Sequence, residues 1–299
     1  MITFFTLPKS FAGHIGVIQN NAIESWKYLI PRCQVLLIGN EEGVRNAALR
    51  FGVDYCESVR KNAQGTPLLD SAFEIADSMA KHPYLCYVNS DIMFLQGIEE
   101  SLNATSNLRQ FVMVGRRTNL DIEKTINFDS QVEIEALVAR SNEEGRLSAY
   151  TALDYFIFPR GTIEMKEFPV GRALWDNWVV WDVRRKNIPL VDATNCLHVV
   201  HQNHAYNHLA GGKAEAFSGE EVKQSWEMLG PDFYPLDIRD ANYVIDSCEG
   251  LIRKKNADYY IRKCMTLPVM KPSLSPIIRY ARTLYRLKSR ILKNGFFGS

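Results

Sequence analysis

The chain has 299 residues, of which 46% are hydrophobic and 11% aromatic, so it can bury a full core and is neither disordered nor fibrous. Its net charge is +1, but residues 271–299 hold seven Lys or Arg and no Asp or Glu, which leaves a mildly acidic body. The six cysteines are widely spaced without a CxxC pair, which argues against a zinc ribbon or a disulfide scaffold. No apolar run approaches the roughly 18 residues of a membrane span, and we expect a cytoplasmic protein.

Short apolar strands alternate with amphipathic helices over the first 115 residues. The expected strands are residues 2–7, 34–39, 53–56, 84–88 and 111–115. The expected helices are residues 16–30 and 44–51, and a third that runs to residue 80 with Thr66 as its N-cap and Pro67 as its first residue. This alternation indicates βαβ units and an α/β fold with a mostly parallel, Rossmann-type sheet flanked by helices.

The second half of the chain is less regular. Residues 116–150 are polar with few apolar anchors, which favours an insertion or the wall of a binding cleft. Strand character returns at 153–161, 188–193 and 196–201, a helix is expected over 175–186, and residues 211–218 are expected to form a mobile loop. We expect one domain over residues 1–270 and a separate C-terminal helix over 271–299.

Three small polar residues, Asn89, Ser90 and Asp91, follow the strand at 84–88 directly. All three residue types bend the backbone, so a turn is the ordinary explanation. In a parallel sheet, however, ligands bind at the carboxyl ends of the strands. A carboxylate there can hold a divalent cation against a nucleotide diphosphate.

The segment YVNSDIMF (87–94), after this N-terminal series of strands and helices, resembles the Asp-X-Asp strand end of GT-A-fold glycosyltransferases. These enzymes transfer sugars from nucleotide diphosphate sugars. Asn89 stands where the first acid of that motif usually lies, and Asp91 matches the second. The resemblance implies that Asp91 ligates the metal directly, that Asn89 makes a weaker contact to metal or ribose, and that Ser90 lies at the donor.

The segment FPVGRALWDNWVVWDVRRKNIPLVDATNCLHVVHQNH (168–204) is similar to the region where inverting members place a catalytic acid, a strand and a metal-binding histidine. The resemblance implies that Asp176 is the general base, with Asp154 as the second candidate or as a group that holds the acceptor hydroxyl. His201, or else His198 or His204, completes the metal site. A helix N-terminus lowers the pKa of Asp176 and burial raises it, and the sequence leaves that balance open.

A mixed oxygen and nitrogen shell suits Mn²⁺ somewhat better than Mg²⁺, and both remain open. The resemblance also assigns donor contacts to several strand ends and loops. These residues are Thr6, Leu7, Pro8, Asn40, Glu41, Asn62, Gly65, Arg116 and Arg117.

The expected function is therefore metal-dependent transfer of a sugar to a hydroxyl of a glycan or lipid-linked glycan, with inversion. Two alternatives stay open: a noncatalytic scaffold or glycan-binding module, which Asn89 favours, and a sugar nucleotidyltransferase, which needs a glycine-rich phosphate loop. Residues 277–293 carry an apolar and a basic stripe at helical spacing, which suits either the acidic body of the protein or an anionic membrane surface. No nucleic-acid reading motif accompanies this charge.

Overall fold

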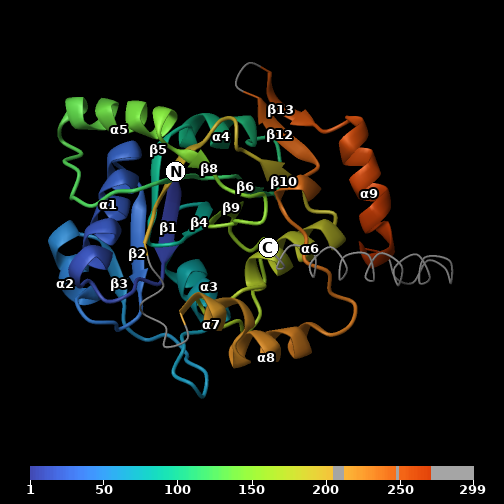
Figure 1. Cartoon of the computed structure of the whole chain (residues 1–299), viewed down its shortest axis with the longest axis horizontal. Helices are drawn as coiled ribbons and strands as arrows, with labels where there is room; N and C mark the ends of the chain where they lie inside the picture. Colours follow the sequence, from blue (N-terminus) through green and yellow to red (C-terminus); the bar gives the residue numbers. More distant parts are fainter. Residues whose placement is uncertain (205–211, 247–248, 271–299) are drawn as a thin grey trace, which may run out of the picture.

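The computed structural model describes residues 1–204, 212–246 and 249–270. A nine-stranded sheet runs through its centre (Figure 1). Its strands are β1 (Ile2–Thr6), β2 (Gln34–Ile38), β3 (Asp54–Cys56), β4 (Tyr84–Val88), β6 (Val112–Val114), β9 (Tyr155–Pro159), β10 (Leu190–Asp192), β12 (Tyr243–Asp246) and β13 (Gly250–Arg253).

The order of strands across this sheet is β13-β12-β10-β6-β9-β4-β1-β2-β3. All neighbours are parallel except that β9 is antiparallel to β4 and β6, and β13 is antiparallel to β12. The predicted α/β fold with a mostly parallel sheet is confirmed.

Alternation of side chains along the strands gives the sheet two apolar faces. From β1, Phe4 contributes to one core and Phe5 to the other. Helices α1 (Gly13–Leu29), α2 (Val44–Phe51) and α4 (Ile98–Ala104) pack on the face of Phe4. Helices α3 (Leu69–Met79), α6 (Trp175–Arg185) and α8 (Glu220–Leu229) contribute to the core on the other face.

A second, four-stranded sheet includes parts of the polar segment 116–150. Its order is β5 (Ile92–Gln96), β11 (His198–Gln202), β7 (Thr118–Leu120) and β8 (Arg146–Leu147). Helix α5 (Gln131–Glu143) packs against it through Ile134 and Leu137. The segment, expected to be an insertion or a cleft wall, therefore contributes two strands and a helix to a small layer that β5 and β11 complete.

Two local expectations are wrong. Helix α3 begins at Leu69 rather than at Pro67, because the Asn62 side chain accepts hydrogen bonds from the backbone of Gln64 and Thr66 and closes a tight turn there. Residues expected to form a mobile loop are instead α7 (Gly212–Ser218), which buries Ala216.

The chain continues through the 3₁₀ turn η1 (Ile238–Asp240) to α9 (Ala257–Met270), which Figure 1 places at the opposite end of the molecule from α2. The helix expected over 277–293 lies outside the described residues, and the domain boundary at residue 270 stays a prediction. Within the described ranges, no helix combines the length and the apolarity needed to cross a bilayer.

Candidate active site

A cavity of about 330 Å³ is lined by residues that come from strand ends, the start of α6 and α7. Many of the predicted site residues meet in it. They are Leu7, Asn89, Ser90, Asp91, Arg117, Asp154, Asp176 and His201.

The connection between β4 and β5 is both a turn and part of the cavity wall. The backbone N–H of Ile92 donates to the carbonyl of Asn89 over 3.1 Å, which closes a β-turn around Ser90 and Asp91. The Ser90 hydroxyl donates to Oε1 of Gln19, a buried residue of α1. The turn is thus anchored to α1, and its carboxylate has a fixed position.

Strand pairing brings a distant histidine to Asp91. Strand β11 is antiparallel to β5 with His201 opposite Ile92, so His201 lies beside the turn. The Nε2 atom of His201 lies 3.8 Å from Oδ2 of Asp91, and Nε2 of His204 lies 2.9 Å from the same oxygen. By contrast, the His198 ring nitrogen bonds the Ser141 hydroxyl at 2.8 Å and does not line the cavity.

The Asp91, His201 and His204 ligand atoms fit a divalent cation. They all lie within 4.8 Å of one another. Oδ1 of Asp91 and Nδ1 of His201 are buried and have no hydrogen-bond partner among the residues that the structure describes, which is costly for polar atoms unless a ligand satisfies them. A carboxylate and imidazoles together suit Mn²⁺ and admit Mg²⁺.

The charge states also favour a cation. Burial alone would raise the pKa of Asp91, but the electrostatic effect of the neighbouring His201 and Lys9 side chains and the hydrogen bond with His204 hold that pKa well below its usual range. Burial lowers the pKa of His201. A carboxylate beside a neutral imidazole presents lone pairs rather than protons.

Asp154 reaches the site because β9 runs antiparallel to β4, so the residue before β9 lies beside the residue after β4. The Asn89 amide donates to Oδ1 of Asp154 over 3.0 Å. Nε of Arg117 lies 2.8 Å from Oδ2 of Asp154 in an ion pair whose orientation makes no hydrogen bond. Burial raises the pKa of Asp154 although Arg117 opposes this shift.

Asp176 enters the cavity from the first turn of α6. The helix follows Leu174, whose φ of 94° is unusual for a residue with a side chain, and Trp175 packs edge-on to Tyr87 at 4.9 Å. Burial raises the pKa of Asp176 to about 7, against a weaker opposing effect of the Asn177 backbone N–H and with a further contribution from Asp154. Desolvation therefore outweighs the backbone hydrogen bonds that the start of α6 gives to this carboxylate.

Three cationic side chains line the same cavity, and the sequence pointed only to Arg117. Arg172 pairs with Glu221 at 2.6 Å. Lys9 has no ion pair among the described residues, and burial lowers its pKa although Asp91 opposes the shift. Gln19 fixes Lys9 by bonding both its backbone N–H and its carbonyl. The sequence signal for Lys9 was its position directly after Pro8, which was expected to end the first strand.

Other predicted donor contacts do not line this cavity. They are Thr6, Pro8, Asn40, Glu41, Asn62, Gly65 and Arg116. Thr6 is buried in the sheet, and Asn40 and Glu41 both contact Lys61 instead. Their roles as donor contacts stay predictions.

No protein-family model and no curated protein sequence matches this chain. The chain is similar in structure to glucosyl-3-phosphoglycerate synthase from Mycobacterium tuberculosis in complex with Mg²⁺ and UDP, with 13% identity, a TM-score of 0.40 and coverage of 70% of this chain and 73% of that one. A second match is the mannosyltransferase PcManGT from Pyrobaculum calidifontis in complex with GDP-Man and Mn²⁺, with 10% identity, a TM-score of 0.40 and coverage of 68% and 56%.

A third match is S. aureus TarS 1-349 in complex with UDP-GlcNAc, with 11% identity, a TM-score of 0.31 and coverage of 40% of this chain and 35% of that one. The chain covers between 22% and 38% of the length of three matched TarS chains. The function of this chain therefore has to be inferred from its own site.

Proposed function

We propose that the chain is a metal-dependent glycosyltransferase, which moves a sugar from a nucleotide diphosphate sugar to a hydroxyl of a glycan or a lipid-linked glycan. One observation carries the proposal. A single cavity joins the Asp91–His201–His204 cluster to a second carboxyl group, Asp176, whose pKa is about 7.

Asp91, through its unpartnered Oδ1, and His201 would hold the metal, while His204 bonds the other oxygen of Asp91 and keeps the carboxylate in place. A divalent cation bound there, Mn²⁺ or Mg²⁺, neutralises charge on the leaving diphosphate. Lys9 adds a half-buried positive charge to the lining of the same cavity. Its ammonium forms no ion pair with a carboxylate of the described residues and is well suited to a phosphate oxygen.

Asp176 is the general base. It accepts the proton of the acceptor hydroxyl as that oxygen bonds to the anomeric carbon, and the bond from this carbon to the diphosphate oxygen breaks. In-line attack inverts the anomeric centre. A carboxylate with a pKa of about 7 is a stronger base than an ordinary aspartate and is still about half ionised at neutral pH. Asp154, held by Arg117 and Asn89, accepts a hydrogen bond from a sugar hydroxyl.

Calorimetric titration with UDP, GDP and CMP, with and without Mn²⁺, tests the donor site. We expect metal-dependent binding of one diphosphate, weakened about tenfold or more by Asp91→Asn, since a charged ligand is lost. Asp129→Asn changes an exposed carboxylate and serves as the matched control. Absence of metal-dependent binding favours the noncatalytic scaffold and contradicts the proposal.

Transfer itself is tested with Asp176→Asn, which preserves shape and removes the base. Loss of general base catalysis is expected to lower the transfer rate by about 10²- to 10⁴-fold. Donor binding is expected to stay close to that of the wild type. Normal turnover by this variant, measured with any nucleotide sugar that the wild type uses, means that the base is assigned wrongly.

A lipid-linked acceptor would bring the enzyme to an anionic membrane surface, and the basic residues within 277–293 suit that partner. Co-sedimentation of the full chain with vesicles of phosphatidylcholine and phosphatidylserine checks this part of the proposal. Joint replacement of Arg279, Arg282 and Arg286 by Gln is expected to reduce sedimentation. Equal sedimentation of both proteins contradicts a membrane role for this segment.

A further inference from the structure

A second cavity, of about 360 Å³, shares no lining residue with the first. It lies among the end of α6, η1, the β12–β13 hairpin and α9. Five cationic side chains line it against one carboxylate. The cationic residues are Arg184, Arg239, Arg253, Arg262 and Lys263, and the carboxylate is Asp240.

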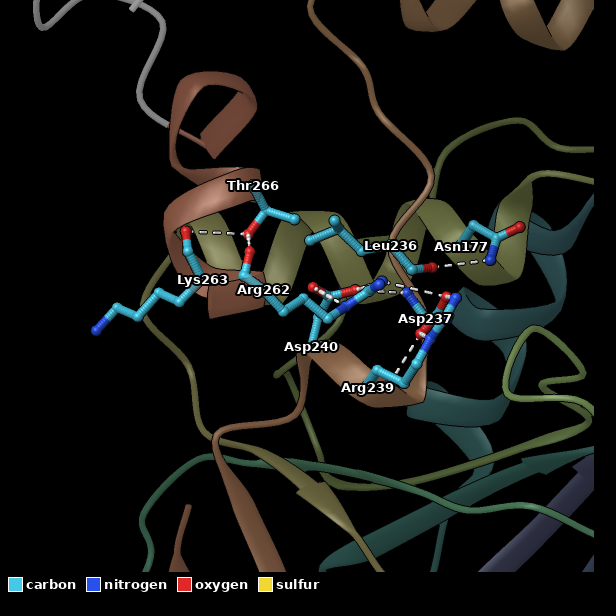
Figure 2. A network of polar contacts seen from close by, with 8 residues as sticks. All are labelled: Asn177, Leu236, Asp237, Arg239, Asp240, Arg262, Lys263 and Thr266. Atoms are coloured by element: carbon cyan, nitrogen blue, oxygen red, sulfur yellow. Dashed lines mark hydrogen bonds and ion pairs between the residues drawn. The ribbon is translucent and has the colours of Figure 1, made fainter. Parts of the chain in front are cut away.

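Part of this charge is neutralised by a fixed network, shown in Figure 2. Arg262 reaches from α9 to Asp240, with nitrogen–oxygen distances of 2.8 and 2.5 Å, and also lies 3.2 Å from Asp237. Arg239 pairs with Asp237 at 2.6 Å. Asp237 and Asp240 are both buried, so this network of charge-assisted hydrogen bonds connects α9 to η1 beside the cavity.

The other three cations keep their charge. Within the described part of the chain, no carboxylate lies within ion-pair distance of Arg184, Arg253 or Lys263. Lys263 lies over the ring of Tyr259 at 5.9 Å, which does not neutralise it. Arg184 is partly buried, and burial lowers its pKa although Tyr259 and Asp240 oppose the shift. Arg184 is thus a partly desolvated cation at the edge of two exposed ones, Arg253 and Lys263, and an anionic ligand would offset that desolvation.

We propose that this second cavity binds a phosphate group, carried by a soluble phosphate ester or by an anionic lipid headgroup. Planar guanidinium groups bind phosphate oxygens in pairs, and Arg184 and Arg253 present two such groups from different elements. The lining also includes the apolar side chains of Leu236, Leu267 and Met270, which accommodate the organic part of the ligand.

Helix α6 links this cavity to the proposed active site. Its first turn carries Asp176, and Arg184 lies eight residues later, about 12 Å away along the helix axis at 1.5 Å per residue. The two cavities therefore lie at opposite ends of one helix and share no lining residue. Phosphate binding at Arg184 requires neither the metal cluster nor the base.

The test is calorimetric titration of the full chain with inorganic pyrophosphate in metal-free buffer at fixed ionic strength. We expect binding by the wild type and equal binding by Asp91→Asn, which separates this site from the proposed metal site. Arg253 and Lys263 are exposed, so the double variant Arg253→Gln/Lys263→Gln is expected to fold normally, as thermal unfolding will verify. Loss of two charge-assisted contacts is expected to weaken binding by about tenfold or more.

Arg146→Gln, at an exposed arginine of β8, is the matched control and is expected to bind as the wild type does. Vesicles of phosphatidylcholine with phosphatidic acid distinguish the two sources. If the wild type sediments with these vesicles and the double variant does not, the ligand is a lipid headgroup. If the double variant sediments as the wild type does but no longer binds pyrophosphate, the ligand is a soluble phosphate ester. Three results would overturn the proposal: the wild type does not bind pyrophosphate, the double variant binds it as tightly as the wild type, or Arg146→Gln weakens binding as much as the double variant does.

Discussion

Replacing Asp176 by Asn is expected to stabilise the folded protein at alkaline pH. Burial raises the pKa of the Asp176 carboxyl from an ordinary value of 3.8 to about 7 in the folded state. Between these values the folded state holds a proton that the unfolded state has lost, so this group lowers the free energy of unfolding as pH rises. Below about pH 4 both states are protonated, and this effect is absent.

The magnitude follows from the size of the shift. About three pKa units at 1.4 kcal/mol each give about 4 kcal/mol as an upper bound above pH 7. The Asp176 side chain is enclosed by protein but is partly open to water through the cavity, so we expect about 2–4 kcal/mol. The neutral amide of Asn avoids this cost.

Urea unfolding of both proteins in metal-free buffer between pH 5 and 8 measures the effect. The free energy of unfolding of Asp176→Asn, relative to that of the wild type, should rise across this range. Other titrating groups are common to both proteins and largely cancel in the difference. Asp129→Asn, at an exposed position, provides the comparison. A difference between Asp176→Asn and the wild type that is independent of pH would refute the reasoning.

Two further predictions concern contacts at the two ends of strand β5. Gly97→Ala places a Cβ atom 2.0 Å from the carbonyl oxygen of Cys196 at a φ of +92°, and is expected to lower the free energy of unfolding by about 3 kcal/mol or more. Gly161→Ala meets open space at a positive φ of +70° and is expected to cost only about 1 kcal/mol. Equal losses of stability on urea unfolding would contradict the clash. Trp26→Phe removes the indole hydrogen bond to the carbonyl of Ile92 and is expected to lower the free energy of unfolding by about 2–3 kcal/mol. Thermal unfolding measures this loss, and an unchanged midpoint would be the contrary result.

The position directly after a central strand predicted Asn89 and Asp91, whereas Asp154, Asp176 and His201 were expected only from the family resemblance. Asn89 and Asp91 follow β4 directly, and this position next to a buried strand carries the information. Asn40 and Glu41 follow β2 in the same way, yet β1 separates β2 from β4 in the sheet, and they do not reach the cavity. Strand order decides which strand ends meet, and the sequence does not give that order.

The remaining differences have similar causes. Which of the three histidines approach Asp91 depends on the register of β11 on β5, since His198 and His201 lie three residues apart on one strand. The position of Lys9 depends on its backbone hydrogen bonds with the Gln19 side chain. This contact between a loop and a helix leaves no periodic pattern in the sequence. Patterns of apolar residues predict strands and helices, whereas register and loop anchoring depend on the whole fold.

The turn at Asp91 joins two different sheets, because β4 belongs to the nine-stranded sheet and β5 to the four-stranded one. Asp91 directly precedes β5 and His201 lies in β11, both in the small sheet, whereas Asp154 directly precedes β9 of the large sheet and Asp176 lies in α6, which packs on that sheet. In the proposed mechanism, the packing of the two sheets against each other therefore sets the distance between the leaving group and the acceptor.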